Sequence, residues 1–490
     1  MRLPVLLAAA ACHTTAHAQL TTWWDGPATG NWSDASSWYY NVVPTGGVGI
    51  YIANNATVTF DIPLVPGVTG FRLGHVAGEY GHLKMSQGEF NANGFNIGYV
   101  GQGILEFSGT AHIQCTNFNL ATQAGSSGSA TINAGEVAAT GITVGQSGVG
   151  DLVLNDGYLH ATGYYAASLP GSFGIFAQTG GLFEAGTANI DHDGHGVAIL
   201  AGGEFNVTNL NVGRGTTGQP GELFIQGTAD ITVLNTFSVG GTDLGTVTQT
   251  GGTVDTHKVW MTTQPSGIGT YLLQGGVLDA NEIYHSNAYP TFDMTGGTLI
   301  VGEFGTPTNN LSLTPTGGLV LPGGKNLGDM TVHGDLDLGN AAAIRYQLDT
   351  PANSDLAIVN GKVALAGSLL AILVNPPTPG DTFLLIDNDS NDPVGGTFQA
   401  LPEGASVTFF HGPDPYTFEI TYTGGDGNDV VLNATDCPPD LTNDGVLDNA
   451  DLSAFVTLYL AGDLAADFTN DGFLDNGDIS AFIAAFLAGC

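Results

Sequence analysis

The sequence predicts a mainly β protein, in which a glycine-punctuated β-solenoid of about ten rungs precedes a terminal β-domain and a small α-helical module. Three observations lead to this prediction: glycines recurring at a fixed spacing, alternating apolar and polar residues between them, and a duplicated acidic loop near the C-terminus. Glycine supplies 74 of the 490 residues, about twice its usual share. The apolar content of 42% is ordinary, so the glycines indicate turns between strands rather than disorder.

Residues 1–18 have the features of a secretory signal. Arg2 gives a positive start, residues 3–11 form an apolar core, and Ala16-His17-Ala18 is a small-residue cleavage site before Gln19. A lipoprotein signal using Cys12 is the alternative, although Ala9 stands where that signal has leucine. We therefore expect a secreted protein, extracellular or associated with the cell surface. No later stretch has the ~18 apolar residues of a membrane span.

Residues 19–70 form an aromatic-rich segment with four of the five tryptophans, which are Trp23, Trp24, Trp32 and Trp38. We expect these rings to cap the open end of the solenoid, since an uncapped end exposes sheet edges. An exposed aromatic strip that binds sugars by stacking is the alternative. The segment and the rungs after it resemble secreted bacterial repeat proteins of the autotransporter-passenger and PEP-CTERM kind.

Residues 71–310 contain the repeat. Its glycines lie 22 to 25 residues apart, at Gly81, Gly103, Gly128, Gly150, Gly174, Gly196, Gly221, Gly245 and Gly269. Each opens a short alternating segment that ends in a second glycine six or seven residues later. Alternation indicates strands with one inward face, and glycine permits the positive φ of tight corners. A fixed period of this length indicates stacked units, so we predict a solenoid, with an array of β-sandwiches as the alternative.

Residues 311–435 change in character and are predicted to form a terminal β-domain. Strand-like runs at 363–374, 382–386 and 418–422 are separated by proline-rich turns. The chain has 8 Lys+Arg against 45 Asp+Glu, and a net charge of −37. This balance argues against nucleic acid and anionic membrane surfaces as partners, because both require clustered cations.

Two twelve-residue acidic loops follow one another near the C-terminus, DLTNDGVLDNAD at 440–451 and DFTNDGFLDNGD at 467–478. A calcium loop takes oxygen ligands from positions 1, 3, 5, 7, 9 and 12, with glycine at position 6. The corresponding residues are Asp440, Thr442, Asp444, Val446 through its carbonyl, Asp448 and Asp451, and then Asp467, Thr469, Asp471, Phe473 through its carbonyl, Asp475 and Asp478. Four carboxylates in each loop repel one another without a cation, so we expect two Ca²⁺ ions. A solvated acidic linker is the alternative.

A helical apolar pattern follows each loop. Its members are Leu452, Phe455, Val456, Tyr459 and Leu460 after the first loop, and Ile479, Phe482, Ile483, Phe486 and Leu487 after the second. Such loop–helix pairs resemble a dockerin module of the type I kind, over roughly residues 436–490. The resemblance implies a cohesin-type partner, read largely at positions 10 and 11, which are Asn449, Ala450, Asn476 and Gly477. Threonine at position 3 departs from the Asn or Asp of the family, which implies weaker calcium binding.

Cys437 and Cys490 bracket this module, and the final Gly-Cys resembles a bacterial dockerin variant with the same ending. A Cys437–Cys490 disulfide would tie the ends of a module whose core is small. A free or lipid-modified terminal cysteine is the alternative.

The rod has one dense cluster of ligand-type residues, the run IDHDGHG with Asp191, Asp193 and His195. These residues are weak candidates for a metal site or an acid–base pair, and a solvated turn is the simpler interpretation. No nucleophile elbow, zinc-protease helix or phosphate-binding loop occurs.

Two functions follow from the sequence. The first is a secreted, non-catalytic structural, surface-display or adhesive rod, tethered through calcium and the dockerin-like module to a cohesin-type partner. The alternative is a polysaccharide-degrading hydrolase or lyase of the β-helix kind, or a carbohydrate-binding subunit, delivered to a multi-enzyme complex; its partner would be an extracellular polysaccharide. The absence of a legible active site favours the first.

Overall fold

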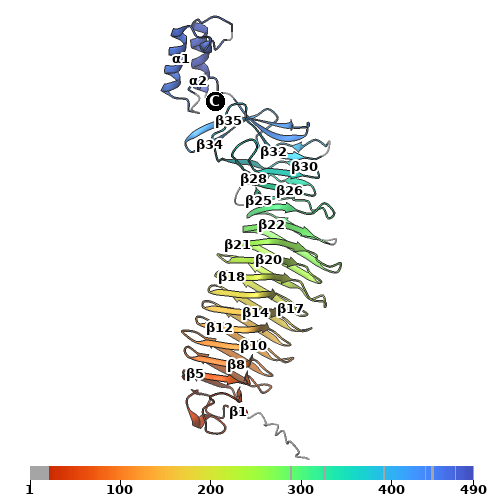
Figure 1. Ribbon diagram of the computed structural model, residues 1–490. Coiled ribbons are helices and arrows are strands. Elements are labelled where there is room, and N and C mark those ends of the chain that lie inside the picture. Colours follow the sequence, from red (N-terminus) through yellow and green to blue (C-terminus); the bar gives the residue numbers. More distant parts are fainter. Residues whose placement is uncertain are drawn as a thin grey trace, which may run out of the picture.

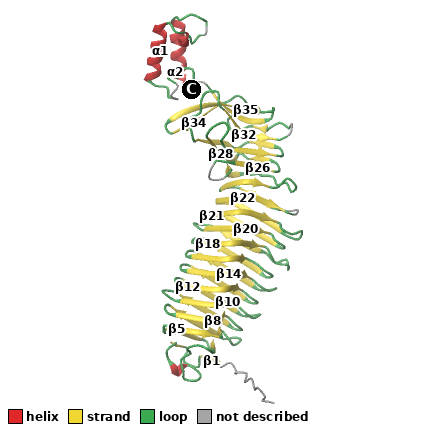
Figure 2. Cartoon of the chain, in the orientation of Figure 1, coloured by secondary structure: helices red, strands yellow, loops and turns green. Residues whose placement is uncertain are grey.

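The computed structural model describes residues 21–286, 290–323, 327–389, 392–435, 437–442, 446–469 and 471–488. It is a parallel β-solenoid of about 14 turns, with 55% strand and 7% helix, that carries two helices at its C-terminal end. Figure 1 shows an elongated rod with β1 at one end and α1 and α2 at the other, and Figure 2 shows that strands make up the length of the rod. The predicted fold class is confirmed.

Two columns of parallel strands form most of the rod. The first column contains β2 (Thr29–Asn31), β4 (Ala56–Phe60), β7 (Tyr80–Met85), β9 (Gln102–Phe107), β11 (Ser127–Ile132), β13 (Val149–Leu154), β15 (Phe173–Gln178), β17 (His195–Leu200) and β19 (Gly221–Ile225). The second contains β1 (Thr21–Trp23), β3 (Gly49–Ile52), β5 (Leu64–Val68), β6 (Gly70–Leu73), β8 (Glu89–Ile97), β10 (His112–Leu120), β12 (Glu136–Val144), β14 (Tyr158–Ala166), β16 (Leu182–Asn189), β18 (Glu204–Val212) and β20 (Asp230–Val239). Two long strands, β21 (Leu244–Met261) and β22 (Ile268–His285), take part in both columns.

The nine-residue strands of the second column change their inward side at the middle. In β10, Ile113 and Cys115 are buried, and after Thr116 the buried positions are Phe118 and Leu120. The shift by one residue means that the strand bends there, and the pairing register skips Thr116. The strands of each turn therefore enclose a common interior. The buried side chains of successive turns form a single hydrophobic core along the rod.

The periodic glycines pair in register along the rod. The sequence predicts that they are needed for positive φ, but the structure shows that they are needed for close packing. Each of them pairs with the corresponding glycine of the next turn, from Gly81 with Gly103 to Gly245 with Gly269. None of the nine has positive φ; instead, a Cβ would meet main-chain or side-chain atoms of the turn corner, 2.2 Å from the Val144 carbonyl oxygen at Gly174. Positive φ belongs to the second glycine of each segment, such as Gly135 at 87°.

The solenoid extends beyond the ten rungs predicted from the repeat. Parallel pairing begins at β1 and crosses residue 311 without a break. It continues through β23 (Thr291–Met294), β24 (Thr298–Phe304), β25 (Gly317–Pro322), β26 (Asp329–Val332), β28 (Ala341–Leu348), β29 (Leu356–Val359), β31 (Ser368–Leu373) and β32 (Thr382–Asn388). The count of about ten was too low because the later turns lack the regular glycines.

The pairing becomes antiparallel only near the end of the rod. There β32 pairs with β36 (Asp429–Ala434), which pairs with β35 (Asp414–Gly424), itself paired with β34 (Ser406–His411). A separate small sheet contains β27 (Leu336–Leu338), β30 (Val363–Leu365) and β33 (Gly395–Gly396). The antiparallel strands cover the last parallel turn.

Three of the four N-terminal tryptophans are buried at the other end of the rod. Trp24, Trp32 and Trp38 are at most 1% exposed, and Trp32 packs against Phe60 and Phe90 of the core. A short 3₁₀ helix, η1 (Ala35–Ser37), lies in this segment. Trp23 is the exception, because it is only partly buried.

The C-terminal module contains α1 (Asn449–Ala461), η2 (Leu464–Ala466) and α2 (Asn476–Ala488). Its core of Phe455, Ala466 and Phe482 is separate from that of the rod, and the rings of Phe455 and Phe482 stack with centroids 4.0 Å apart. Among the described residues, no helix has both the length and the apolar character needed to cross a bilayer.

Candidate functional site

Each acidic loop leads directly into a helix, and the two helices begin at the same loop position, at Asn449 and Asn476. Asp448, at position 9 of the first loop, caps α1 and accepts a hydrogen bond from the Ala450 N–H. Asp451, at position 12, completes a capping box by accepting the Asp448 N–H. The loop and its helix therefore form one hydrogen-bonded unit.

The last aspartate of each loop is buried and accepts the same three hydrogen bonds. Asp451 accepts the N–H and the hydroxyl of Thr442, at 3.0 and 2.9 Å, and the N–H of Asp448 at 3.0 Å. Asp478 accepts the N–H and the hydroxyl of Thr469, at 3.0 and 2.9 Å, and the N–H of Asp475 at 2.8 Å. The two loops thus share one geometry as well as one sequence pattern.

These hydrogen bonds favour the ionised form of both carboxyls. The N–H of Asp475, with the N–H and hydroxyl of Thr469, lowers the pKa of Asp478. For Asp451, desolvation acts to raise the pKa, but the donors from Asp448 and Thr442 outweigh it and the pKa is lowered. Both position-12 side chains therefore carry a negative charge at neutral pH.

Positions 1, 3 and 12 bring three oxygens together in each loop. The Thr442 hydroxyl lies 2.9 Å from Asp451 Oδ1 and 3.3 Å from Asp440 Oδ1. In the second loop, the Thr469 hydroxyl has the same distances to Asp478 Oδ1 and Asp467 Oδ1. A hydroxyl carries one proton and can satisfy only one of the two carboxylates. A hard cation satisfies such a group of oxygens, so these residues fit Ca²⁺.

The other acidic side chains of the second loop accept main-chain N–H groups. Asp467 accepts the N–H groups of Asp471 and Gly472, Asp471 that of Phe473, and Asp475 that of Gly477. Within the described part of the chain, no three His, Cys, Asp or Glu side chains are grouped closely enough to hold a metal. Calcium binding would therefore turn further carboxylates inward. Gly472 has a φ of 83°, the left-handed conformation that suits the loop's sharp turn.

Some predicted ligands and the disulfide cannot be placed. Asp444 lies outside the described residues, as do its neighbours Asn443 and Gly445, although Val446 at position 7 is described. Cys490 also lies outside them, so the Cys437–Cys490 bridge stays a prediction. The predicted partner-reading residues Asn449, Ala450 and Asn476 are exposed in the first turns of the helices, and Gly477 is partly exposed.

The helices also expose apolar side chains that belong to the helical pattern predicted from the sequence. Val456 and Leu460 of α1 are 52% and 79% exposed, and Ile483 and Leu487 of α2 are 45% and 79% exposed. The reason is that two helices in contact can bury only one narrow face each, which Phe455 and Phe482 already fill. The four exposed side chains occupy equivalent positions in the two helices, and we refer to them together as the apolar helix face. The duplication of these positions was visible in the sequence, but their exposure was not.

Comparison with known proteins gives no relative. No family model, no curated protein and no solved structure matches the chain.

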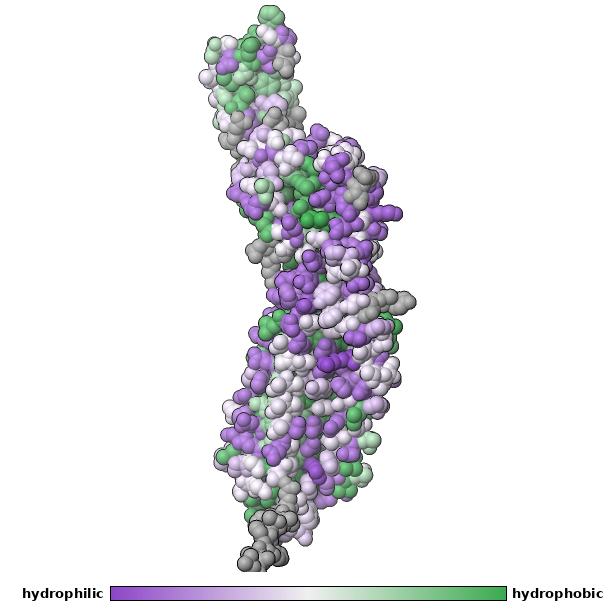
Figure 3. Space-filling view, turned by 45° about the vertical axis from the view of Figure 1, so that its right-hand side comes forward, coloured by the Kyte–Doolittle hydropathy of each residue, from purple (hydrophilic) through white to green (hydrophobic). Residues whose placement is uncertain are grey.

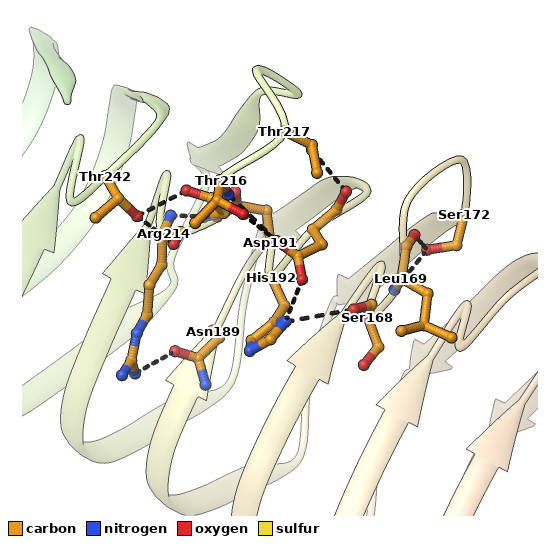
Figure 4. A network of polar contacts seen from close by, with 12 residues as sticks. Ser168, Leu169, Ser172, Asn189, Asp191, His192, Arg214, Thr216, Thr217 and Thr242 are labelled. Carbon is orange, nitrogen blue, oxygen red and sulfur yellow. Dashed lines mark hydrogen bonds and ion pairs between the residues drawn. The ribbon is translucent and has the colours of Figure 1, made fainter. Parts of the chain in front are cut away.

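The cluster of the rod has a geometry that points to a structural role. Asp191 lies in the corner between β16 and β17 and is fully buried. Its carboxylate accepts the N–H groups of Gly213, Arg214 and Gly215, in the corner after β18, at 2.7, 2.9 and 3.2 Å. At a neighbouring corner, the Gly240 N–H is instead bound by a main-chain carbonyl, that of Val212. Figure 4 shows Asp191 beside Arg214 and Thr216 of the following turn.

The other two candidates, Asp193 and His195, contact different residues. Asp193 accepts the N–H and hydroxyl of Thr216, whereas His195 Nε2 lies 2.9 Å from Glu222 Oε2 on the next turn. Burial is the largest influence on Asp191 and raises the pKa of its carboxyl, against the three N–H donors. The Asp191 side chain is fully buried, so a substrate-sized molecule cannot reach it.

Replacing Asp191 with alanine should destabilise the rod, because the buried N–H groups of Gly213 and Gly215 and the partly buried N–H of Arg214 would lose their acceptor. Each unsatisfied group costs about 1–3 kcal/mol, so we expect a loss of roughly 3 kcal/mol or more. Chemical denaturation measures this loss, and Asp193→Ala, at a more exposed carboxylate, is the matched control. Equal stability of the two variants would contradict the structural role.

Proposed function

We propose that this chain is a secreted, non-catalytic rod that a calcium-dependent, dockerin-like module attaches to a cohesin-type protein. The observation that carries the proposal is the repeated geometry at positions 1, 3 and 12 of the two acidic loops. The same hydroxyl stands between the same two carboxylates in both copies, at the same distances. A solvated acidic linker would not be expected to have the same hydroxyl–carboxylate contacts in both copies.

Calcium would be held by the six ligand positions of each loop, from Asp440 to Asp451 and from Asp467 to Asp478. Bound there, Ca²⁺ supplies positive charge that offsets the repulsion among the carboxylates. The module's own core is small, so the energy of ion binding would add directly to the stability of its fold. Threonine at position 3 contributes a hydroxyl in place of an amide or carboxylate oxygen, which predicts modest affinity.

The apolar helix face supports docking to a protein partner. Leu460 and Leu487 are each 79% exposed, and Val456 and Ile483 lie one turn away on the same helices. Figure 3 shows hydrophobic residues gathered at the terminal module, while most of the visible rod surface is polar. Exposed apolar groups on a secreted protein with net charge −37 are typical of an interface.

The rod would serve as a spacer between the tether and its far end. About 14 turns, at ~4.8 Å each, give a length of roughly 65 Å. Its interior is filled by side chains from one end to the other, so it is a stiff body rather than a flexible linker. Such a rod would hold its N-terminal end away from the surface to which the module is attached.

Docking should depend on calcium and on the apolar helix face. We expect the purified chain to bind members of a panel of immobilised cohesin domains in calcium and not in EDTA, measured by biolayer interferometry. The double variant Leu460→Asp with Leu487→Asp should weaken binding about thirtyfold or more, as for a desolvated hot spot. Leu234→Asp, at a leucine of the rod that is 69% exposed, is the control. Binding that survives both EDTA and the double variant would refute the proposal.

A further inference from the structure

A cavity of about 460 Å³ lies at the N-terminal end of the rod, where the corners of the first turns meet. Trp23 of β1 and Tyr51 of β3 line it, together with His75 from the corner that follows β6. Trp23 and Tyr51 are paired in register, so their side chains leave neighbouring turns on the same side. In Figure 1 this end, marked by β1, lies opposite α1 and α2.

Ring stacking holds the aromatic walls of the cavity in place. Tyr39 stacks on Trp23, with ring centroids 3.5 Å apart. His75 stacks on Tyr51 at 4.1 Å, with their planes inclined by 6°. Tyr39 thus covers one face of Trp23, and His75, which itself lines the cavity, covers one face of Tyr51. Rigid aromatic walls of this kind bind with little loss of side-chain entropy.

Polar groups stand beside the aromatic walls. Asp25 and Asn54 line the cavity, and Asp25 is exposed at its rim. Within the described structure, the buried Nδ1 of His75 has no hydrogen-bond partner. Burial, and then the nearby Arg72 cation, lowers the pKa of His75, so its ring is neutral at pH 7. Aromatic walls with a few convergent polar groups are typical of a ligand site.

The charges around the cavity select the class of ligand. An anionic ligand would meet Asp25 and the net charge of −37. A cationic ligand would meet the Arg72 guanidinium, which lies 5.2 Å from the centroid of Tyr51 and 3.9 Å from that of Tyr99. A neutral molecule with an apolar face and several hydroxyls satisfies both the rings and the polar groups. A pyranose ring has this character.

We infer that this cavity is a subsite for a neutral sugar ring of an extracellular polysaccharide, stacked on Trp23 and Tyr51. The site uses neither calcium nor the apolar helix face, so it stands or falls separately from the docking proposal. Together the two would place a sugar-binding end and a tethering end at opposite ends of one rod.

Affinity electrophoresis of the purified chain through gels containing polysaccharide tests the inference. We expect retardation by at least one neutral glycan among xylan, glucomannan, mannan and mixed-linkage glucan, and none by polygalacturonate or chitosan. Trp23→Ala should weaken that binding about tenfold or more, because the main aromatic wall is lost. Trp260→Ala is the matched control: Trp260 lies in the same outward column of the rod, paired with Ser238 and Tyr284.

A second substitution separates binding from folding. Trp23→Phe keeps an aromatic face and should retain most of the binding, whereas Trp23→Ala should lose it while its circular dichroism and melting temperature stay unchanged. The inference is overturned if no neutral glycan retards the chain, if only a charged polymer does, or if Trp23→Ala and Trp260→Ala behave alike. Retained retardation in EDTA is expected, since docking and sugar binding use different ends.

Discussion

Removal of calcium is expected to unfold the C-terminal module while the rod stays folded. Among the described residues of the module, only Phe455, Ala466 and Phe482 are buried hydrophobic side chains, and the two loops contain eight aspartates. A free Ca²⁺ concentration one hundred times the dissociation constant stabilises a protein by about 2.7 kcal/mol per site. The stabilisation lost when both sites are empty exceeds the stability that so small a core gives the module. Differential scanning calorimetry of the whole chain should show a module transition that EDTA lowers or abolishes, and a rod transition that it leaves in place.

Substitution of the position-12 aspartates provides the matched test. Asp451→Ala with Asp478→Ala removes the buried acceptors of both loops, so the module transition should become low and insensitive to calcium. Asp230→Ala removes an exposed charge from the rod and should change neither transition. A module that melts at one temperature in calcium and in EDTA would show that the loops are not calcium sites.

Gly174→Ala is expected to destabilise the rod by about 3–5 kcal/mol, in the range of severe core substitutions. A Cβ at Gly174 would lie 2.2 Å from the carbonyl oxygen of Val144 and 2.7 Å from the nitrogen of Ala167, and both atoms belong to the main chain. Because the φ of Gly174 is not in the left-handed region, the cost arises from this close approach and not from backbone strain. The denaturation midpoint measures the loss, and hydrogen exchange should show it concentrated in the adjacent turns.

Gly70→Ala is the control for this substitution. Gly70 also lies in a strand of the solenoid, outside the left-handed region, but a Cβ there would have no atom within 4 Å. Its stability should stay within about 0.5 kcal/mol of the parent chain, as for an ordinary surface change. If Gly174→Ala were equally harmless, the periodic glycines would not be explained by packing between turns.

The repeat made most of the fold predictable, because a residue that recurs every turn reveals both the period and the register. Gly128 and Gly150 are separated by one period and are direct neighbours in the ladder. The turns after residue 311 were not predictable in this way. There the parallel pairing continues through strands without the opening glycines, as in β26 with β29, where Asp329 pairs with Leu356 and Val332 with Val359. Parallel pairing needs matched strands, whereas only the tightest corners need glycine.

The positions of the candidate calcium ligands could be predicted from their spacing in the sequence. Spacing identified the loops, and the structure adds that Thr442 and Thr469 each contact two carboxylates. Spacing could not show that Asp191 is buried, since a corner aspartate accepting three N–H groups has the same sequence as a solvated one. Nor could it show that Trp23 differs from its neighbours, because exposure depends on what the next turn covers.

The pairing of each turn only with its neighbours makes the length of this molecule adjustable. Deleting or duplicating one full period, such as residues 128–149, would restore the same contacts across the junction and alter the span by one ladder spacing. Neither extremity would be disturbed, because each is built from segments outside the repeat. The length of the rod could therefore change in steps of one turn while the aromatic N-terminal end and the C-terminal module keep their structures.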